Sequence, residues 1–172
     1  MKRLLLLRHA KSGWDDPATR DFDRPLNPRG LEAARAIGAE MRKLGLAFDA
    51  IVSSPAARAV ETLAEASHGY GAPLAAVEDG CLYLAPMSML LEIVRATDDN
   101  VGRLLLVGHN PGFELLAAAL TEGDDSPDRA AMAGKYPTGA LAEIAFEIER
   151  WQSVAPGTGR LVRFIRPRDL ED

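Results

Sequence analysis

Two histidines and two arginines stand in sequence contexts where they could do chemistry on a phosphoryl group: His9, His109, Arg8 and Arg58. An unprotonated imidazole nitrogen can attack phosphorus and hold it covalently, provided that the other ring nitrogen is hydrogen-bonded. An adjacent guanidinium can neutralise phosphate oxygens through paired hydrogen bonds. A second histidine can donate to the same oxygens as charge develops. His9 is therefore the candidate nucleophile, and Arg8, Arg58 and His109 complete the candidate catalytic set.

Each of these residues also has an ordinary structural interpretation. Arg8-His9 could be the end of a strand with a surface arginine, and His109 could be a polar residue at a turn. Arg58 could pair with Glu61 on a helix surface. An arginine in the first turn of a helix is disfavoured by the helix dipole, so a bound anion would explain that choice. No single residue decides the question.

Arg24 and Asn110 are the candidates for binding the substrate. Arg24 lies in Asp21-Phe22-Asp23-Arg24-Pro25, where it could be a phosphate ligand or the ion-pair partner of Asp21 or Asp23. The two interpretations of Arg24 are equally favoured. Asn110 directly follows His109 and would face the same ligand.

The elements that must position these residues are short apolar runs alternating with longer helical patterns, which is typical of a layered α/β domain. Helix starts are indicated where a capping side chain precedes a proline, as in Asn27-Pro28, Ser54-Pro55 and Asn110-Pro111. A fourth helix is predicted over Ser88–Ala96, and Thr121–Pro137 is predicted to be mostly loop. The predicted strands are Lys2–Leu7, Ala50–Ser53, Arg103–Val107, Leu141–Phe146 and, at an edge, Leu161–Ile165.

The predicted strand ends place the candidate residues on one rim of the sheet. Arg8-His9 and His109 each end a strand, and Arg58 lies in the first turn of a helix that follows another strand. In open α/β sheets, ligands bind at the carboxyl ends of the strands. Helix N-termini at that rim offer free N–H groups to anions. The sequence therefore predicts a phosphate pocket there.

Composition limits the other possibilities. The 172 residues suit one domain over residues 1–172, with 47% hydrophobic and 26% charged residues. No run approaches the roughly 20 apolar residues that span a bilayer, and the apolar run after Arg3 is too short for a signal peptide. The single Cys81 fits a reducing compartment, so a cytoplasmic protein is expected. The net charge of -5 gives no general attraction to nucleic acid or to an anionic membrane.

No cofactor is expected either. The carboxylates do not cluster with the histidines as a two-metal site would require, and arginines can supply the positive charge instead. We therefore expect a site that works without a metal.

Four motifs together resemble the histidine phosphatase superfamily, and more closely its small branch typified by bacterial phosphohistidine phosphatases of the SixA type. The resemblance runs from Leu4 to about Leu141, and its motifs occur in the same order at matching spacing. They are Arg8-His9-Ala10-Lys11-Ser12 with Trp14, Arg24-Pro25-Leu26 through Gly30, Ser54-Pro55 with Arg58-Ala59 and Thr62, and Gly108-His109-Asn110-Pro111-Gly112.

The resemblance implies a three-layer α/β/α sandwich with a mostly parallel sheet, as in phosphoglycerate mutase. It implies that His9 becomes phosphohistidine, that Arg8, Arg58 and His109 surround the phosphoryl group, and that no metal is needed. The implied substrate is a protein phosphohistidine or a small phosphorylated molecule.

The chain also departs from the wider superfamily. Ala10 follows the histidine where mutases and broad phosphatases commonly have Gly. Larger members carry a glutamate general acid after the third strand, where this chain reads Glu78-Asp79-Gly80-Cys81-Leu82. The proton donor could be Glu78, Asp79 or solvent.

Two other functions are compatible with the motifs. The first is phosphotransfer of the phosphoglycerate mutase type, although the short chain leaves little room to enclose a sugar acid through two transfers. The second is a non-catalytic phosphate-binding module, against which the retained histidines and arginines argue.

Overall fold

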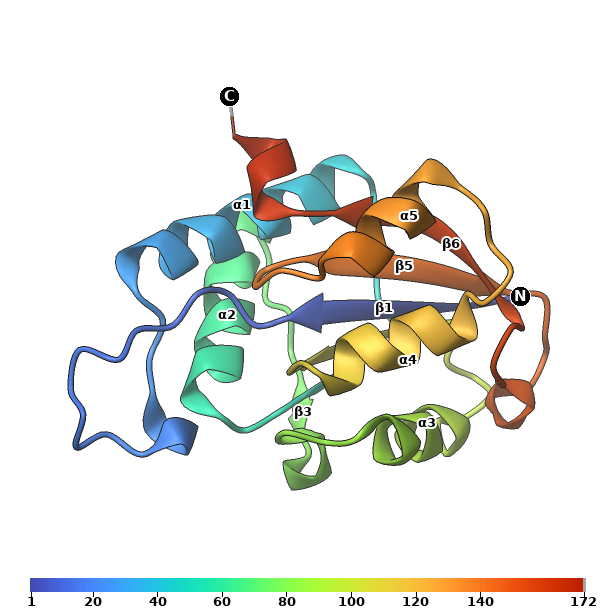
Figure 1. Cartoon of the computed structure of the whole chain (residues 1–172), viewed down its shortest axis with the longest axis horizontal. Helices are drawn as coiled ribbons and strands as arrows, with labels where there is room; N and C mark the ends of the chain where they lie inside the picture. Colours follow the sequence, from blue (N-terminus) through green and yellow to red (C-terminus); the bar gives the residue numbers. More distant parts are fainter. Residues whose placement is uncertain (172) are drawn as a thin grey trace.

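The computed structural model describes residues 1–171 and contains a six-stranded sheet with helices on both faces (Figure 1). The strands lie in the order β3-β2-β4-β1-β5-β6. β5 is antiparallel to both of its neighbours, whereas β1, β2, β3 and β4 are parallel. The mostly parallel sheet of an α/β fold is thus confirmed. The strand bounds are β1 Lys2–Arg8, β2 Ala50–Ser53, β3 Val77–Glu78, β4 Arg103–Gly108, β5 Leu141–Phe146 and β6 Gly159–Ile165.

The helices form two layers that enclose this sheet. Figure 1 shows α1 and α2 together on one side and α3 and α4 on the other. Their bounds are α1 Pro28–Lys43, α2 Ala57–Tyr70, α3 Met87–Arg95, α4 Gly112–Leu120 and α5 Pro127–Gly134.

The leucine run of β1 serves both cores. Successive side chains of a strand point to opposite faces of the sheet. Leu5 and Leu7 therefore belong to the cluster that contains residues of α1 and α2. Leu4 and Leu6 belong to the cluster that contains residues of α3, α4 and α5. This division confirms the three-layer α/β/α sandwich and explains why β1 shows no polar alternation.

The predicted helix start is correct for α1 and wrong in detail for α2 and α4. At α4 the N-cap is Pro111 and not Asn110, and the side chain of Pro111 makes no capping hydrogen bond. The Asn27 side chain accepts a hydrogen bond from the Gly30 N–H at 2.8 Å, directly before Pro28. At α2, however, the N-cap is Ala56, and the Ser54 hydroxyl accepts from the Ala56 N–H at 3.2 Å. Ser54 is not the cap because its side chain serves the turn before the helix.

The prediction that Thr121–Pro137 is mostly loop is wrong over α5. Ser126 caps this helix by accepting from the Arg129 N–H at 3.2 Å, and Pro127 is its first residue. This is the same combination of cap and proline that marks α1. The helix is only 8 residues long and buries one of them, Met132, so its apolar periodicity is too weak to be recognised.

Candidate active site

The four candidate catalytic residues line one cavity of about 390 Å³ at the carboxyl ends of β1 and β4. Arg8 is the last residue of β1, and it lies in register with Gly108 of the parallel strand β4. The residues that follow, His9 and His109, are therefore neighbours, with ring centroids 5.2 Å apart. Arg58 reaches the same cavity from the first turn of α2. The predicted shared rim is thus present.

His9 has the tautomer that a nucleophile needs. Its Nδ1 lies 2.7 Å from the carbonyl oxygen of Ala10, which can only accept, so Nδ1 carries the proton. Nε2 is then unprotonated, and Arg58 Nε lies 3.4 Å from it. Burial, together with the charges of Arg58, Arg8 and Arg24, lowers the pKa of His9 to about 4. The ring is therefore neutral at physiological pH.

His109 is buried beside His9. One of its ring nitrogens is hydrogen-bonded, and the other has no hydrogen-bond partner among the described residues. Nε2 lies 2.7 Å from Ser54 Oγ, and Nδ1 has no hydrogen-bond partner. Since Ser54 Oγ already accepts from the Ala56 N–H, its own proton is available for His109 Nε2. Burial, with the charges of His9 and Arg58, lowers the pKa of His109 to about 3. The arrangement favours a neutral ring with Nδ1–H available as a donor.

Arg58 is held by Asp21. The Arg58 guanidinium, 3% exposed, donates to the Asp21 backbone oxygen at 2.7 Å and to its carboxylate at 3.1 Å. Tyr83 donates its hydroxyl proton to the same carboxylate. Burial opposes ionisation of Asp21, but the hydrogen bonds from Tyr83 and Arg24 and the charge of Arg58 outweigh it and lower its pKa to about 2. Asp21 is therefore an anion built into the pocket wall.

The position of Arg24 agrees in part with both interpretations of the sequence, as a phosphate ligand and as an ion-pair partner. It lines the cavity, and it also forms the ion pair with Asp21, at 3.0 Å. Its other amino group donates to Ser12 Oγ at 2.6 Å, and its guanidinium carbon lies 3.6 Å from the centre of the Trp14 ring. Arg24 is thus fixed in place on several sides, with its charge at the cavity.

Arg8 and Asn110 line the cavity beside one shared backbone group. Arg8 Nη1 and Asn110 Nδ2 both donate to the Tyr136 carbonyl, at 2.9 and 3.1 Å. The Arg8 Nε is buried and has no hydrogen-bond partner among the described residues. Desolvation lowers the Arg8 pKa. The Asn110 side-chain oxygen accepts from the Glu114 N–H at 3.2 Å, so its amide also serves the start of α4.

Sequence reasoning missed the roles of Asp21, Tyr83 and Thr62. Asp21 was recognisable only as a neighbour of Arg24, three residues away. The Thr62 hydroxyl accepts from the Ala10 N–H at 2.9 Å, which fixes the loop after His9. Nothing in the sequence around Tyr83 indicated a role in the site, because its partner Asp21 lies 62 residues away in the chain.

The two carboxylates considered as proton donors lie outside the cavity. Glu78 is exposed in the edge strand β3, and the Asp79 carboxylate accepts from the Cys81 N–H at 2.8 Å. Among residues 1–171, Asp21 is the one carboxylate that lines the cavity. Its low pKa keeps it ionised, so it is poorly suited to donate a proton.

A cluster of metal-binding side chains and a membrane-spanning helix are both absent from residues 1–171. No group of three or more histidine, cysteine, aspartate or glutamate side chains is placed to hold a metal ion in this part of the chain. No helix in the same range is both long enough and apolar enough to cross a membrane.

Comparison with known proteins gives concordant matches. The family model of the histidine phosphatase superfamily (branch 1) matches residues 4–79. An uncharacterized protein of Mycobacterium tuberculosis is 38% identical over 164 residues, which cover 94% of this chain and 100% of that protein.

Two solved structures match along nearly the whole chain. The "putative phosphohistidine phosphatase SixA" of Agrobacterium tumefaciens is 31% identical with a TM-score of 0.81, covering 96% of this chain and 98% of that one. The protein of the same description from Nakamurella multipartitia is 29% identical with a TM-score of 0.82, covering 96% of each chain. This chain belongs to the histidine phosphatase superfamily and is similar to its SixA proteins.

Proposed function

We propose that this protein is a metal-independent phosphatase that forms a phosphohistidine intermediate at His9. The observation that carries the proposal is the hydrogen bond from His9 Nδ1 to the Ala10 carbonyl, which leaves Nε2 unprotonated in a cavity lined by three arginines, Arg8, Arg24 and Arg58. A neutral imidazole at the bottom of a cationic pocket is suited to attack an anion that the pocket attracts.

The reaction proceeds in two displacements. In the first, the lone pair of His9 Nε2 forms a bond to phosphorus, and the bond from phosphorus to the leaving group breaks with its electron pair. The leaving group takes a proton from solvent. In the second, water attacks the phosphohistidine, the P–N bond breaks, and inorganic phosphate leaves.

The remaining residues act on the phosphoryl group. Arg8 and Arg58 neutralise its oxygens, and His109 Nδ1–H donates to the oxygen on which charge develops. Arg24 and Asn110 bind the substrate at the mouth of the cavity. Because these arginines supply the positive charge, no metal is required in this proposal.

The missing general acid points to the substrate. An alkoxide is a very poor leaving group without a positioned acid, whose contribution is typically ~10²–10⁴ in rate. Imidazole leaves far more easily, because its conjugate acid titrates near pH 6.5. We therefore propose a protein phosphohistidine or a small phosphoramidate as the substrate, ahead of alkyl phosphates. The single cysteine, Cys81, which is free and exposed, supports a reducing, cytoplasmic setting.

Labelling during turnover tests the proposal. Histidine should carry an acid-labile, alkali-stable phosphoryl group, and His9→Ala should abolish both the label and the release of p-nitrophenol from p-nitrophenyl phosphate. Activity should survive EDTA. An unchanged rate in His9→Ala would remove the central claim, and loss in EDTA with recovery on adding one divalent ion would indicate a different mechanism. Assay with phosphoglycerate tests the mutase alternative.

A further inference from the structure

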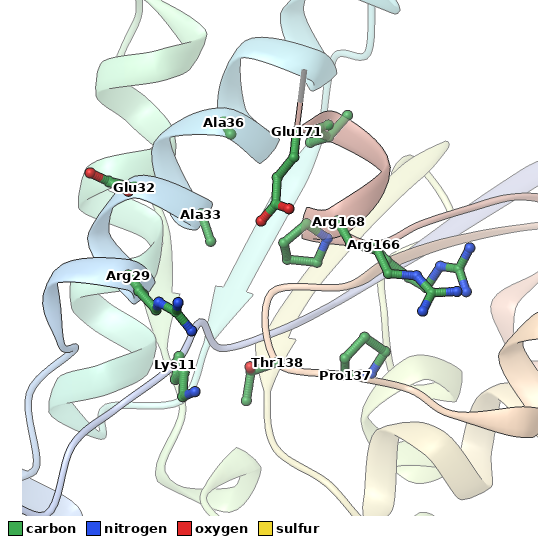
Figure 2. A pocket seen from close by; sticks show the side chains of 12 residues that line it. Lys11, Arg29, Glu32, Ala33, Ala36, Pro137, Thr138, Arg166, Arg168 and Glu171 are labelled. Carbon is green, nitrogen blue, oxygen red and sulfur yellow. The ribbon is translucent and has the colours of Figure 1, made fainter.

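A larger cavity of about 670 Å³ adjoins the catalytic pocket and is bordered by four basic side chains (Figure 2). We call it the basic groove; four basic residues line it, Lys11, Arg29, Arg166 and Arg168, against two acidic ones, Glu32 and Glu171. We propose that the basic groove binds carboxylates on the surface of a protein substrate whose phosphohistidine occupies the catalytic pocket. This inference rests on the proposed function and specifies its substrate.

The groove and the catalytic pocket are continuous. Lys11 and Thr138 line both cavities. Lys11 lies two residues after His9, and Thr138 precedes Gly139, whose N–H donates to the His9 carbonyl at 2.9 Å. A substrate with its phosphoryl group at His9 therefore extends over Lys11 and Thr138 into the groove.

The end of the groove nearest the pocket carries two cations that the backbone brings together. The Lys11 carbonyl accepts from the Asn27 N–H at 3.0 Å, which joins the loop after His9 to the start of α1. A Cβ on Gly30 would lie 2.0 Å from that carbonyl, so only glycine allows this approach. The next residue back, Arg29, consequently lies beside Lys11, and Figure 2 shows their side chains together near Thr138.

These two cations have no carboxylate partner among the described residues. The ion pairs of residues 1–171 include Arg166 with Asp169 at 2.9 Å but neither Lys11 nor Arg29. Figure 2 shows the Glu171 carboxylate entering the groove from the C-terminal segment, away from Lys11. Because the chain has a net charge of -5, two neighbouring cations without a carboxylate partner form a local concentration of positive charge.

The character of the groove favours a macromolecular ligand. Lys11, Arg29 and Arg168 are exposed, and they come from three separate segments of the chain. Small ligands are usually enclosed and mostly buried by their sites. Exposed cations around a reactive centre are instead typical of the polar rim of a protein interface, where they steer and orient a partner of opposite charge. An acidic surface flanking the phosphohistidine has the matching charge.

Two synthetic phosphohistidine peptides test the proposal. One carries a run of glutamates beside the phosphohistidine, and the other carries glutamines at the same positions. The intact protein should hydrolyse the acidic peptide with about tenfold higher kcat/KM at low salt, and the preference should shrink as salt screens the charges. In Arg29→Glu the two peptides should become equivalent. The matched control is Lys43→Glu, the same charge reversal at the far end of α1.

Both variants should retain wild-type turnover of p-nitrophenyl phosphate, which is too small to reach the groove. Glutamate in the first turn of a helix is favourable, so Arg29→Glu is expected to fold. An unchanged peptide preference in Arg29→Glu overturns the inference while leaving the proposed function intact. The inference is also overturned if Arg29→Glu slows the hydrolysis of 2,3-bisphosphoglycerate but not that of the peptides. The groove would then bind the second phosphate of a small substrate. No turnover of any substrate by the wild type would overturn the proposed function itself.

Discussion

The hydroxyl of Thr62 joins the loop after the candidate nucleophile to the helix that carries Arg58. It accepts a hydrogen bond from the Ala10 N–H at 2.9 Å and donates to the Arg58 carbonyl at 2.6 Å. Both bonds are buried. His9 and Arg58 lie 49 residues apart in the chain, and this one side chain fixes the backbone of both segments relative to each other.

Thr62→Val should therefore reduce both stability and activity. Valine keeps the shape but leaves the buried Ala10 N–H without an acceptor, at a cost of about 1–3 kcal/mol in the free energy of unfolding. Urea unfolding and kcat for p-nitrophenyl phosphate measure the two effects. Thr121→Val is the matched control, because the buried Thr121 hydroxyl donates only to the Ala117 carbonyl in α4. If both valine variants behave alike, Thr62 has no special role in the site.

Asp21→Asn should lower kcat and strengthen inhibition by inorganic phosphate. The carboxylate holds Arg24 and Arg58, so its loss loosens their orientation, yet it also removes one negative charge from the anion site. We expect roughly fivefold tighter phosphate inhibition, as expected for a single charge near the surface. Asp23→Asn provides the control, because Asp23 pairs with the exposed Arg20. Weaker inhibition in Asp21→Asn would show that holding the arginines outweighs the charge.

The two buried histidines predict the direction of acid sensitivity. Their pKa values are lowered to about 4 for His9 and about 3 for His109, from an ordinary value of 6.5. Below pH 6.5 the unfolded chain binds protons that the folded chain refuses, so acid favours unfolding. The contribution of the two histidines to the free energy of unfolding should be fully present above pH 6.5. It should decline as the pH falls toward 4 and then 3. Urea titrations across this window measure the decline, which should be shallower in His109→Asn.

The lowered pKa of His9 also sets the pH below which catalysis should be lost. Because His9 remains unprotonated down to about pH 4, kcat/KM should not lose its nucleophile near pH 6.5. A pH profile with a substrate of constant ionisation reports this limit. An acid limb centred near 6.5 would mean that His9 titrates as if exposed.

Glu78→Gln and Asp79→Asn should leave activity unchanged toward both an aryl and an alkyl phosphate. Glu78 is exposed on β3, and Asp79 caps the turn that begins at Gly80. Neither lines the catalytic cavity. A selective loss of alkyl phosphate hydrolysis by about a hundredfold in either variant, the size expected of a lost general acid, would contradict the absence of a donor.

The sequence predicted those parts of the site that depend on local pattern. Buried strands that lead directly into a polar residue or a helix placed His9, His109 and Arg58 on one rim, because parallel strands end together. Resemblance to a family supplied the three-layer arrangement. Residues that reach the site by long-range contact, such as Tyr83, left no local pattern to recognise.

The missed elements have a similar explanation. β3 is a strand of two residues, Val77–Glu78, too short to show any alternation, and α5 is short with a single buried residue. Such elements form because the rest of the fold offers them a partner. Local propensity is a weak guide to such short elements. For α5, the one remaining indication in the sequence was the cap and proline at its start, Ser126-Pro127.

The central position of β1 has a consequence for how the protein is made. Its neighbours in the sheet are β4, Arg103–Gly108, and β5, Leu141–Phe146, so β1 is synthesised before both of its pairing partners, which come from the second half of the chain. Until then, a nascent chain exposes Leu4–Leu7 as an apolar strand with two unpaired edges. Such segments invite association between unfinished chains. We therefore expect unfinished chains of this protein to associate more readily than the complete chain, in which β4 and β5 cover both edges of β1.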